Sequence, residues 1–322
     1  ITNETKLFKF GSGCTSGDSF IFTNKFGLIK IRDLFDKHKD RPIQNFDGQG
    51  RFINIQDEEI YTYSLNKDGS FSEDLIEKVW DYKVKKEDKL KIKLNNGTRV
   101  TVSAWHPFIF WDGSKIIKKR ADELEEGDPV LGINSTILPL LPEEEIKIKW
   151  DNIYFRKTEK NELSLDNDLS WLIGYFMGDG NLGKRKTTVK NKEYTNLRLR
   201  FHDETLETLD KVKNILENKF NAKINLSKDN RGSKGYTLQT LSRKACSFFK
   251  EIFGSGSKTY TLRMPKFIYK SGLENITAFL AGLLDSDGYI TKDGKAVYSS
   301  ASREFATEIA ILSSLIGTGG GI

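Results

Sequence analysis

The sequence predicts a multidomain protein in which an all-β unit is followed by an α+β unit that contains an internal repeat. The chain has 322 residues, enough for two or three domains of ordinary size. From about residue 18 to 130, short apolar alternations are interrupted by Gly, Asn and Asp, whereas the second half has the longer periods of helices. One apolar nonapeptide occurs twice, which indicates two copies of one supersecondary unit.

The first half is expected to consist of short strands joined by tight turns. Turn residues such as Asn95-Asn96-Gly97 separate alternating apolar stretches, which is typical of antiparallel hairpins. The expected strands include residues 20–22, 89–94 and 99–102. One or two helical turns are expected at Ile31–Phe35 and again at Ala121–Leu124.

The second half is expected to combine helices with strands. Pro139, Pro142 and three consecutive glutamates mark a linker or small extension between residues 136 and 165. The helical periods that follow cover Trp171–Met177, Leu206–Phe220, Arg243–Phe253, Leu273–Leu284 and Ser302–Leu315. Strand-like stretches lie between them at Thr195–Phe201 and Tyr236–Leu241.

Charge and cysteine content restrict the class of protein. A net charge of +6 and a pI near 9.0 permit a nucleic-acid partner, although a lysine-rich thermophile surface has the same composition. The two cysteines cannot form a disulfide framework, so we expect a cytoplasmic protein. No apolar run reaches the roughly 20 residues of a membrane span, and the N-terminus has no secretory pattern.

The two nonapeptides, residues 172–180 and 280–288, match position for position in residue type. Each has small residues four apart, which allow two helix backbones to approach closely. These are Gly174 and Gly178 in the first copy, and Gly282 and Ser286 in the second. The expected arrangement is a pair of parallel helices related by a pseudo-two-fold axis.

Each nonapeptide ends in Asp-Gly. A carboxylate at a helix C-terminus faces the negative end of the helix dipole, which costs a few tenths of a kcal/mol. One such turn is common, but two at the same place in a repeat favour a functional reason. If the helices pack together, Asp179 and Asp287 converge, and a hard divalent cation between them would relieve their repulsion.

These motifs resemble the paired motifs of the LAGLIDADG, or dodecapeptide (DOD), homing endonucleases. The resemblance implies that Asp179 and Asp287 bind the Mg²⁺ (or Mn²⁺) ions used to hydrolyse double-stranded DNA. Met177 departs from the family pattern, in which an earlier acidic residue often stands, while Asp285 fills that place in the second copy. Family members often carry a lysine near the proline upstream of the second motif. Arg263 and Lys266 are both candidates for this basic group.

A basic stretch runs into the first predicted strand of the second half, Thr195–Phe201. Seven Lys or Arg residues and a single acidic residue lie between Gly183 and Arg200, and residues 197–201 alternate basic with apolar. Such a β-ribbon can lie in the major groove of DNA, although a soluble edge strand would look similar. The DNA-binding candidates are Lys184, Arg185, Lys186, Lys190, Arg198 and Arg200.

A second constellation surrounds Cys14. Gly11-Ser12-Gly13 precedes this cysteine, and Ser103-Ala104-Trp105-His106 lies far downstream. The set resembles the first two splicing blocks of inteins, which have the Hedgehog/intein (HINT) horseshoe fold, with Ser103 in place of the usual threonine. The resemblance implies that Cys14 attacks the carbonyl of Gly13, that His106 protonates the leaving amine and that Ser103 orients the peptide, without a cofactor. Taken singly, Cys14 would be read as a small buried hydrophobe and His106 as a core histidine. Cys246 is interpreted as a core residue.

The two ends of the chain suggest a longer element. Residues 2–13 resemble a segment of adenosylcobalamin-dependent (class II) ribonucleotide reductases, so a host extein is expected in cis. The His-Asn end of an intein is absent, and the second repeat is expected to stop near Leu315, so we interpret the element as C-terminally truncated.

The predicted division is a host remnant at 1–13, the N-terminal part of a HINT domain at 14–135, a linker at 136–165 and an endonuclease at 166–322. We expect a monomeric, self-splicing DNA endonuclease. Three alternatives remain: a reductase fragment, a LAGLIDADG-fold DNA-binding protein without cleavage, and a Hedgehog-type autoprocessing domain. The first needs more host sequence, the second leaves Cys14 and His106 unexplained, and the third leaves the repeat unexplained.

Overall fold

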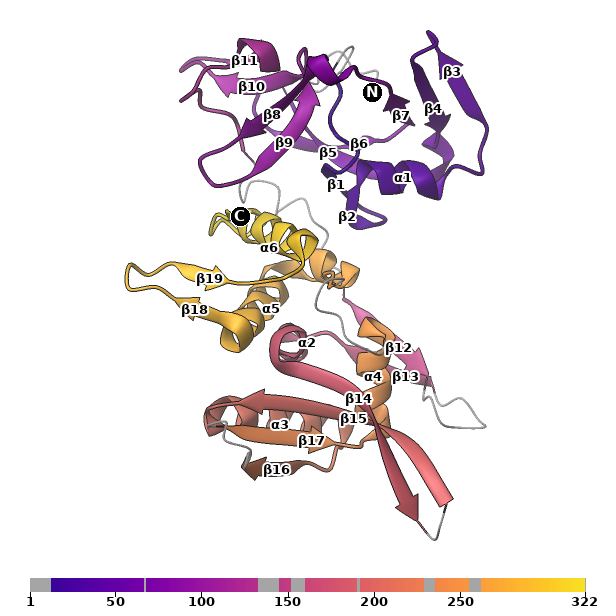
Figure 1. The fold of residues 1–322 in the computed structure, drawn as a ribbon, viewed down its shortest axis with the longest axis vertical. Coiled ribbons are helices and arrows are strands. Elements are labelled where there is room, and N and C mark those ends of the chain that lie inside the picture. Colours follow the sequence, from indigo (N-terminus) through magenta and orange to yellow (C-terminus); the bar gives the residue numbers. More distant parts are fainter. Residues whose placement is uncertain are drawn as a thin grey trace. The chain divides into compact units, whose positions relative to one another are not determined.

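A computed structural model describes residues 13–66, 68–132, 145–151, 160–189, 192–228, 235–254 and 262–321. The chain divides into two compact units, formed by residues 1–141 with 310–322 and by residues 142–309 (Figure 1). Each unit is considered by itself. No helix among the described residues is long and apolar enough to cross a membrane.

The first unit is built mainly from antiparallel hairpins. Its strands are β1 (Phe20–Thr23), β2 (Gly27–Lys30), β3 (Ile43–Phe46), β4 (Gly50–Asn54), β5 (Tyr61–Leu65), β6 (Phe71–Leu75), β7 (Lys78–Tyr82), β8 (Lys89–Lys93), β9 (Arg99–Ser103), β10 (Pro107–Trp111) and β11 (Ile116–Arg120). Helix α1 (Ile31–Lys37) and the short 3₁₀ helices η1 (Gln56–Glu58), η2 (Lys86–Asp88) and η3 (Ala121–Glu123) complete it. The predicted β8–β9 hairpin, α1 and η3 are confirmed. The horseshoe arrangement stays a prediction, and α1 makes the unit mostly β rather than wholly β.

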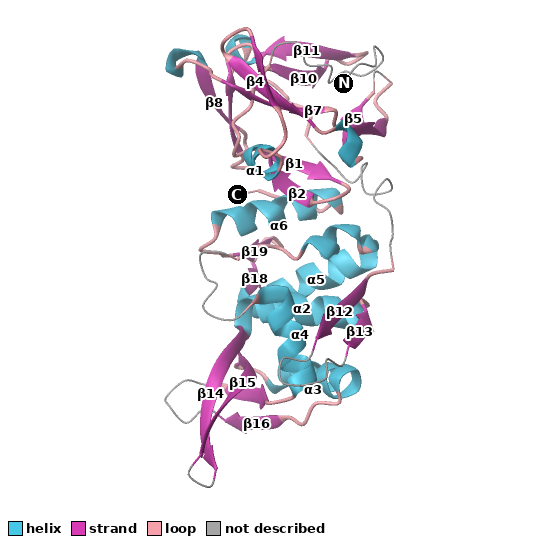
Figure 2. Ribbon diagram, turned by 90° about the vertical axis from the view of Figure 1, so that its right-hand side faces the viewer, coloured by secondary structure: helices cyan, strands magenta, loops and turns pink. Residues whose placement is uncertain are grey.

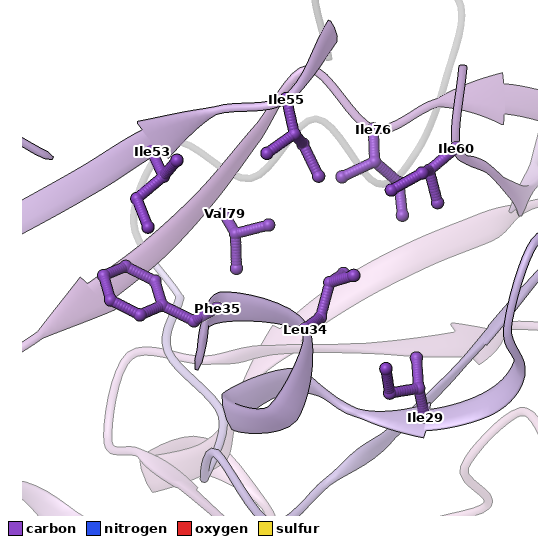
Figure 3. Packing of buried hydrophobic residues seen from close by; sticks show 8 residues of the cluster. All are labelled: Ile29, Leu34, Phe35, Ile53, Ile55, Ile60, Ile76 and Val79. Atoms are coloured by element: carbon purple, nitrogen blue, oxygen red, sulfur yellow. The ribbon is translucent and has the colours of Figure 1, made fainter. Parts of the chain in front are cut away.

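One hydrophobic core lies beneath α1 (Figure 3). Leu34 and Phe35 of the helix pack with Ile53 of β4 and Val79 of β7, and Leu34 and Ile53 are almost completely buried. Burying a side chain of this size contributes about 1.5–3 kcal/mol, so these contacts hold the short helix on the sheet. The remaining members of the cluster are Ile29, Ile55, Ile60 and Ile76.

The second unit has the mixed helix and strand content that was predicted. Its helices are α2 (Asn167–Asp179), α3 (Leu206–Phe220), α4 (Arg243–Phe253), η5 (Lys266–Lys270) and α5 (Gly272–Asp287), and α6 (Arg303–Leu315) begins in it. Helix α2 begins four residues before its predicted start, because the Asp166 side chain accepts a hydrogen bond from the Leu169 N–H (2.9 Å) and caps it.

The strands of the second unit form one four-stranded sheet and two hairpins. The sheet has the order β14-β15-β17-β16, and its strands are β14 (Gly180–Val189), β15 (Lys192–Asp203), β17 (Tyr236–Thr240) and β16 (Asn225–Lys228). The hairpins are β12 (Lys147–Asp151) with β13 (Lys160–Ser164), and β18 (Gly288–Ile290) with β19 (Ala296–Tyr298). Helices α3 and α4 both contact β15 (Figure 2). Leu199 and Phe201 are fully buried.

Candidate functional sites

Strand β9 holds the backbone around Cys14 in a fixed position. The Ser103 N–H donates to the Cys14 carbonyl (2.9 Å), and the Cys14 N–H donates to the Ser103 hydroxyl (3.1 Å). The pairing continues where the Ser16 N–H donates to the carbonyl of Thr101 (2.8 Å). Ser103 therefore contacts Cys14 through both its backbone and its side chain, which fits the orienting role expected for it.

His106 lies beside the peptide bond that precedes Cys14. Its backbone N–H donates to the Ser103 carbonyl (2.9 Å) in the turn that follows β9. A Cβ atom built onto Gly13 would lie 3.0 Å from His106 Nδ1 and 2.5 Å from Pro107 Cδ. A side chain at position 13 would therefore clash with its neighbours, which favours glycine there. The same short distances show that the His106 imidazole lies beside the predicted Gly13–Cys14 junction. We call Gly13, Cys14, Ser103 and His106 the splicing site.

Burial shifts the two titratable groups of the splicing site in opposite directions. Burial raises the pKa of the Cys14 thiol. It lowers the pKa of His106, against a smaller opposing effect of a hydrogen bond with the Cys14 backbone. At neutral pH the site therefore contains a protonated thiol and an uncharged imidazole, which can accept a proton and pass it on.

The nonapeptide helices α2 and α5 pack backbone against backbone. A Cβ atom on Gly174 would lie 2.2 Å from the Phe279 carbonyl oxygen, and one on Gly282 would lie 2.0 Å from that of Trp171. Four residues beyond Gly174, a Cβ atom on Gly178 would meet the Ser286 side chain. Contacts that advance along both helices together show parallel packing, and the predicted role of the small residues is confirmed.

Asp179 and Asp287 meet at the end of this helix pair. A Cβ atom on Gly178, the neighbour of Asp179, would lie 3.0 Å from Asp287 Oδ2. Burial, the charge of Asp287 and the charge of Asp203 raise the pKa of Asp179 to about 6, while His202 opposes the shift. Burial also raises the pKa of Asp287. We call this pair the paired-aspartate site.

The paired-aspartate site suits a cation that needs few protein ligands. Among the described residues there is no group of three or more His, Cys, Asp or Glu side chains that could hold a metal. Two carboxylates with raised pKa values are nevertheless an unfavourable pair that a cation would relieve. Mg²⁺ is commonly held by one or two carboxylates together with substrate phosphates, so the donor set fits this ion.

A cavity of about 530 Å³ opens beside Asp287. Its apolar walls include Phe176, Leu182 and Phe253. Its polar lining includes Asn181, Asp287, Tyr298, Ser299 and Ser300. Burial and the charges of Asp287 and Asp179 raise the pKa of Tyr298, so its phenol is neutral at physiological pH.

The two basic candidates differ in their surroundings. Arg263 donates to Glu308 Oε1 (2.6 Å) and lies 3.3 Å from Glu304 Oε2, and Glu308 is 2% exposed. Lys266 is exposed at the start of η5. Because Arg263 is committed to two carboxylates, Lys266 is the better candidate for a group that approaches DNA.

The basic stretch forms part of the β14–β15 hairpin. Arg198 and Arg200 alternate with buried Leu197, Leu199 and Phe201, so the two arginines lie on the opposite face of β15. The Arg200 guanidinium donates to Asn181 Oδ1 (3.0 Å), directly across the ladder. Lys184, Arg185 and Lys186 are exposed on β14, whereas Lys190 lies outside the described residues.

Sequence reasoning missed the groups beyond the two aspartates. The Tyr175 hydroxyl donates to Asp203 Oδ2 (2.6 Å), and the charge of Asp203 acts on Asp179. Strand β15 was predicted to end at Phe201, two residues too early, which left His202 and Asp203 outside the expected sheet. The available signal was the polar pair His202 and Asp203, which directly follows the alternating basic and apolar residues of the strand.

Two family profiles match the chain. The intein splicing domain family matches residues 20–292, which is more than half of the chain, and the LAGLIDADG-like domain family matches residues 274–319. Both matches agree with the resemblances drawn from the motifs.

The curated relatives are longer proteins whose names describe different activities. The chain is 25% identical over 322 residues to a protein of the A-type ATP synthase of Pyrococcus abyssi, covering 96% of this chain and 29% of that protein. It is 22% identical over 293 residues to the alpha chain of the NrdEB ribonucleoside-diphosphate reductase of Bacillus subtilis, covering 89% of this chain and 23% of that protein. The chain thus spans less than a third of the length of these relatives.

Similar solved structures include a solution structure of the Pab PolII intein, at 23% identity and a TM-score of 0.34. That match covers 46% of this chain and 74% of the other. Variants of the homing endonuclease I-DmoI match at 19% identity and a TM-score of 0.28, covering 38% of this chain and 62% of the other.

Proposed function

The chain belongs to the intein splicing domain family, and on this premise we propose that it combines autocatalytic protein splicing with site-specific cleavage of double-stranded DNA. The observation that carries the first activity is the position of Gly13 against His106, with Ser103 holding Cys14 by two hydrogen bonds. The observation that carries the second is the meeting of Asp179 and Asp287 at the end of a glycine-lined helix pair.

Splicing begins with an N–S acyl shift at the Gly13–Cys14 bond. Cys14 Sγ attacks the Gly13 carbonyl carbon, a carbon–sulfur bond forms, and the carbon–nitrogen bond to Cys14 breaks. The proton of the thiol ends on the new amine, and neutral His106 relays it. The result is a thioester, with the host segment that ends at Gly13 attached to Cys14.

Thiol-induced release tests this step. The folded chain, incubated with a strong thiol, should release a fragment that ends at Gly13, measured by mass spectrometry. Cys14→Ala should abolish the release, while Cys246→Ala is the matched control because Cys246 is a buried thiol of the other unit. Release that persists in Cys14→Ala would refute the assignment of the nucleophile.

The proposed DNA cleavage uses the paired-aspartate site. Asp179 and Asp287 would hold Mg²⁺, with Mn²⁺ as the alternative ion. A bound divalent cation would supply a Lewis acid that activates water and stabilises the leaving oxygen. Lys266 is proposed as the basic group that neutralises charge on the phosphate, ahead of Arg263, whose guanidinium is committed to Glu304 and Glu308.

Double-stranded DNA is the proposed partner of the β14–β15 hairpin. Exposed Lys184, Arg185 and Lys186, together with Arg198 and Arg200, supply positive charge for the phosphates and donors for base edges. Lys190 is included in this proposal on its sequence position alone. Incubation with DNA that spans the uninterrupted insertion site and Mg²⁺ tests the activity, and the absence of a cut would refute it. The cut should be lost in excess chelator, and a cut that survives chelation would refute the role of the metal.

The remaining proposals concern the cellular setting. We propose a DOD-type endonuclease that acts as a cytoplasmic monomer and is inserted in cis in an adenosylcobalamin-dependent ribonucleotide reductase. The support for the host is the sequence motif that ends at Gly13. Sequencing the coding region on both sides of this segment tests it, because a host of another family would exclude the reductase.

A further inference from the structure

The hairpin that follows the second nonapeptide places a tyrosine at the cleavage site. Gly288 is the first residue of β18, directly after Asp287, and its partner across the ladder is Tyr298 of β19. Directly opposed residues of an antiparallel pair have Cβ positions only about 4.5–5.5 Å apart, so Tyr298 lies next to the end of α5. The local register, and not a distant contact, determines this placement.

Tyr298 also lines the cavity that Asp287 lines. Its ring packs edge-on against Phe305 (centroids 6.0 Å apart, 87° between planes), and Phe305 is fully buried. This contact fixes the ring. Within the part of the chain that the structure describes, no hydrogen bond joins the Tyr298 hydroxyl to another group.

The cavity needs a donor that carries no negative charge. Ionised aspartates only accept hydrogen bonds, and they repel a phosphate that approaches them. A phenol can donate its proton in a hydrogen bond to a phosphate oxygen without adding charge. Tyr298 offers this donor on the wall that Asp287 shares.

We propose that the Tyr298 hydroxyl donates a hydrogen bond to the DNA phosphate seated beside Asp179 and Asp287, and so is a further catalytic residue of the cleavage site. This inference rests on the proposed endonuclease function. It adds a residue outside both nonapeptides and outside the basic stretch.

Two variants of the full chain test the proposal. Tyr298→Phe removes the hydroxyl and keeps the ring against Phe305. Tyr289→Phe is the matched control, because it removes a hydroxyl from the same hairpin at a residue that is 57% exposed. Three quantities are measured: the single-turnover cleavage rate with Mg²⁺, the affinity for target DNA without metal, and tyrosine-sensitised emission of Tb³⁺, a hard cation that carboxylates bind.

Tyr298→Phe is expected to lower the cleavage rate about 10²-fold, the effect typical of losing one preorganised donor. Its DNA affinity should stay within about twofold of wild type, because binding is spread over many phosphate contacts. It should also give weaker Tb³⁺ emission than Tyr289→Phe. If the wild-type protein cuts DNA and Tyr298→Phe cuts it at the same rate, the role of Tyr298 is overturned and the endonuclease proposal stands.

If the wild-type protein does not cut DNA, the Tb³⁺ emission tests the placement of Tyr298. Equal emission from the two variants would then overturn the placement of Tyr298, and its loss in Tyr298→Phe alone would support it. If wild type neither cuts DNA nor binds Tb³⁺, the endonuclease proposal fails first and this inference fails with it.

Discussion

The splicing site and the paired-aspartate site differ in their electrostatics. The splicing site is held by one backbone and one side-chain hydrogen bond between Cys14 and Ser103, and its thiol and imidazole are both uncharged at neutral pH. The paired-aspartate site brings two like charges together at the unfavourable ends of two helices. The first site therefore contains no charged side chain, whereas the second contains two carboxylates whose repulsion a bound cation would relieve.

The largest expected effect is on cleavage. Asp179→Asn and Asp287→Asn should each lower the cleavage rate on the order of 10³-fold, because each removes one of the two proposed cation ligands. DNA affinity, measured by electrophoretic shift, should change little, since Lys and Arg contacts carry it. Asp293→Asn, at a 60% exposed carboxylate on the β18–β19 turn, is the control. Unchanged cleavage in either aspartate variant would remove that residue from the site.

The helix contact beneath the aspartates sets the next largest effect. Gly282→Ala should lower the free energy of unfolding by about 3 kcal/mol, because the new methyl group would lie 2.0 Å from the Trp171 carbonyl oxygen and the helices must separate. Gly132→Ala is the control, since nothing lies within 4 Å of its Cβ position. Urea denaturation gives both values, and equal stability would contradict the close packing.

The pH dependence of stability should separate the two sites. The pKa of Asp179 is raised to about 6 from an ordinary value of 3.8, so the folded state binds its proton more tightly than the unfolded state does. The contribution of Asp179 to the free energy of unfolding should therefore fall as pH rises from about 4 to about 6. The difference in the free energy of unfolding between wild type and Asp179→Asn, measured across this window, isolates that contribution. Mg²⁺ should stabilise the wild-type protein more at pH 7 than at pH 5. A difference between the two proteins that does not change with pH would contradict the shift.

The smallest expected effect tests the orientation of Cys14. Ser103→Ala removes the side-chain acceptor of the Cys14 N–H but leaves the backbone pairing intact. One hydrogen bond of this kind is worth about 1 kcal/mol, so thiol-induced release should slow roughly fivefold. Ser114→Ala, in the exposed β10–β11 turn, is the control. A complete loss of release would instead assign Ser103 a chemical role.

The sequence predicted the regular helices of this protein better than the polar ends of its other elements. Helices α3 and α4 have the bounds that were expected, because their apolar periods are regular over three or more turns. Strand β15 and helix α2 were predicted too short, since polar residues at their ends carry no periodic signal. Asp166 begins α2 as a cap, and Asp203 extends β15 toward the paired aspartates.

By itself, the sequence determined which residues are proposed to carry the chemistry. Both Asp-Gly motifs and the Cys14 and His106 blocks are local patterns, and the small residues that let α2 and α5 approach are readable at their four-residue spacing. Only the tertiary structure decided what those residues face. It commits Arg263 to Glu304 and Glu308 and brings Asp203 to Asp179. The physical reason is that ion pairing, desolvation and cross-strand contact depend on distances of a few ångströms between residues far apart in the chain, which no local pattern encodes.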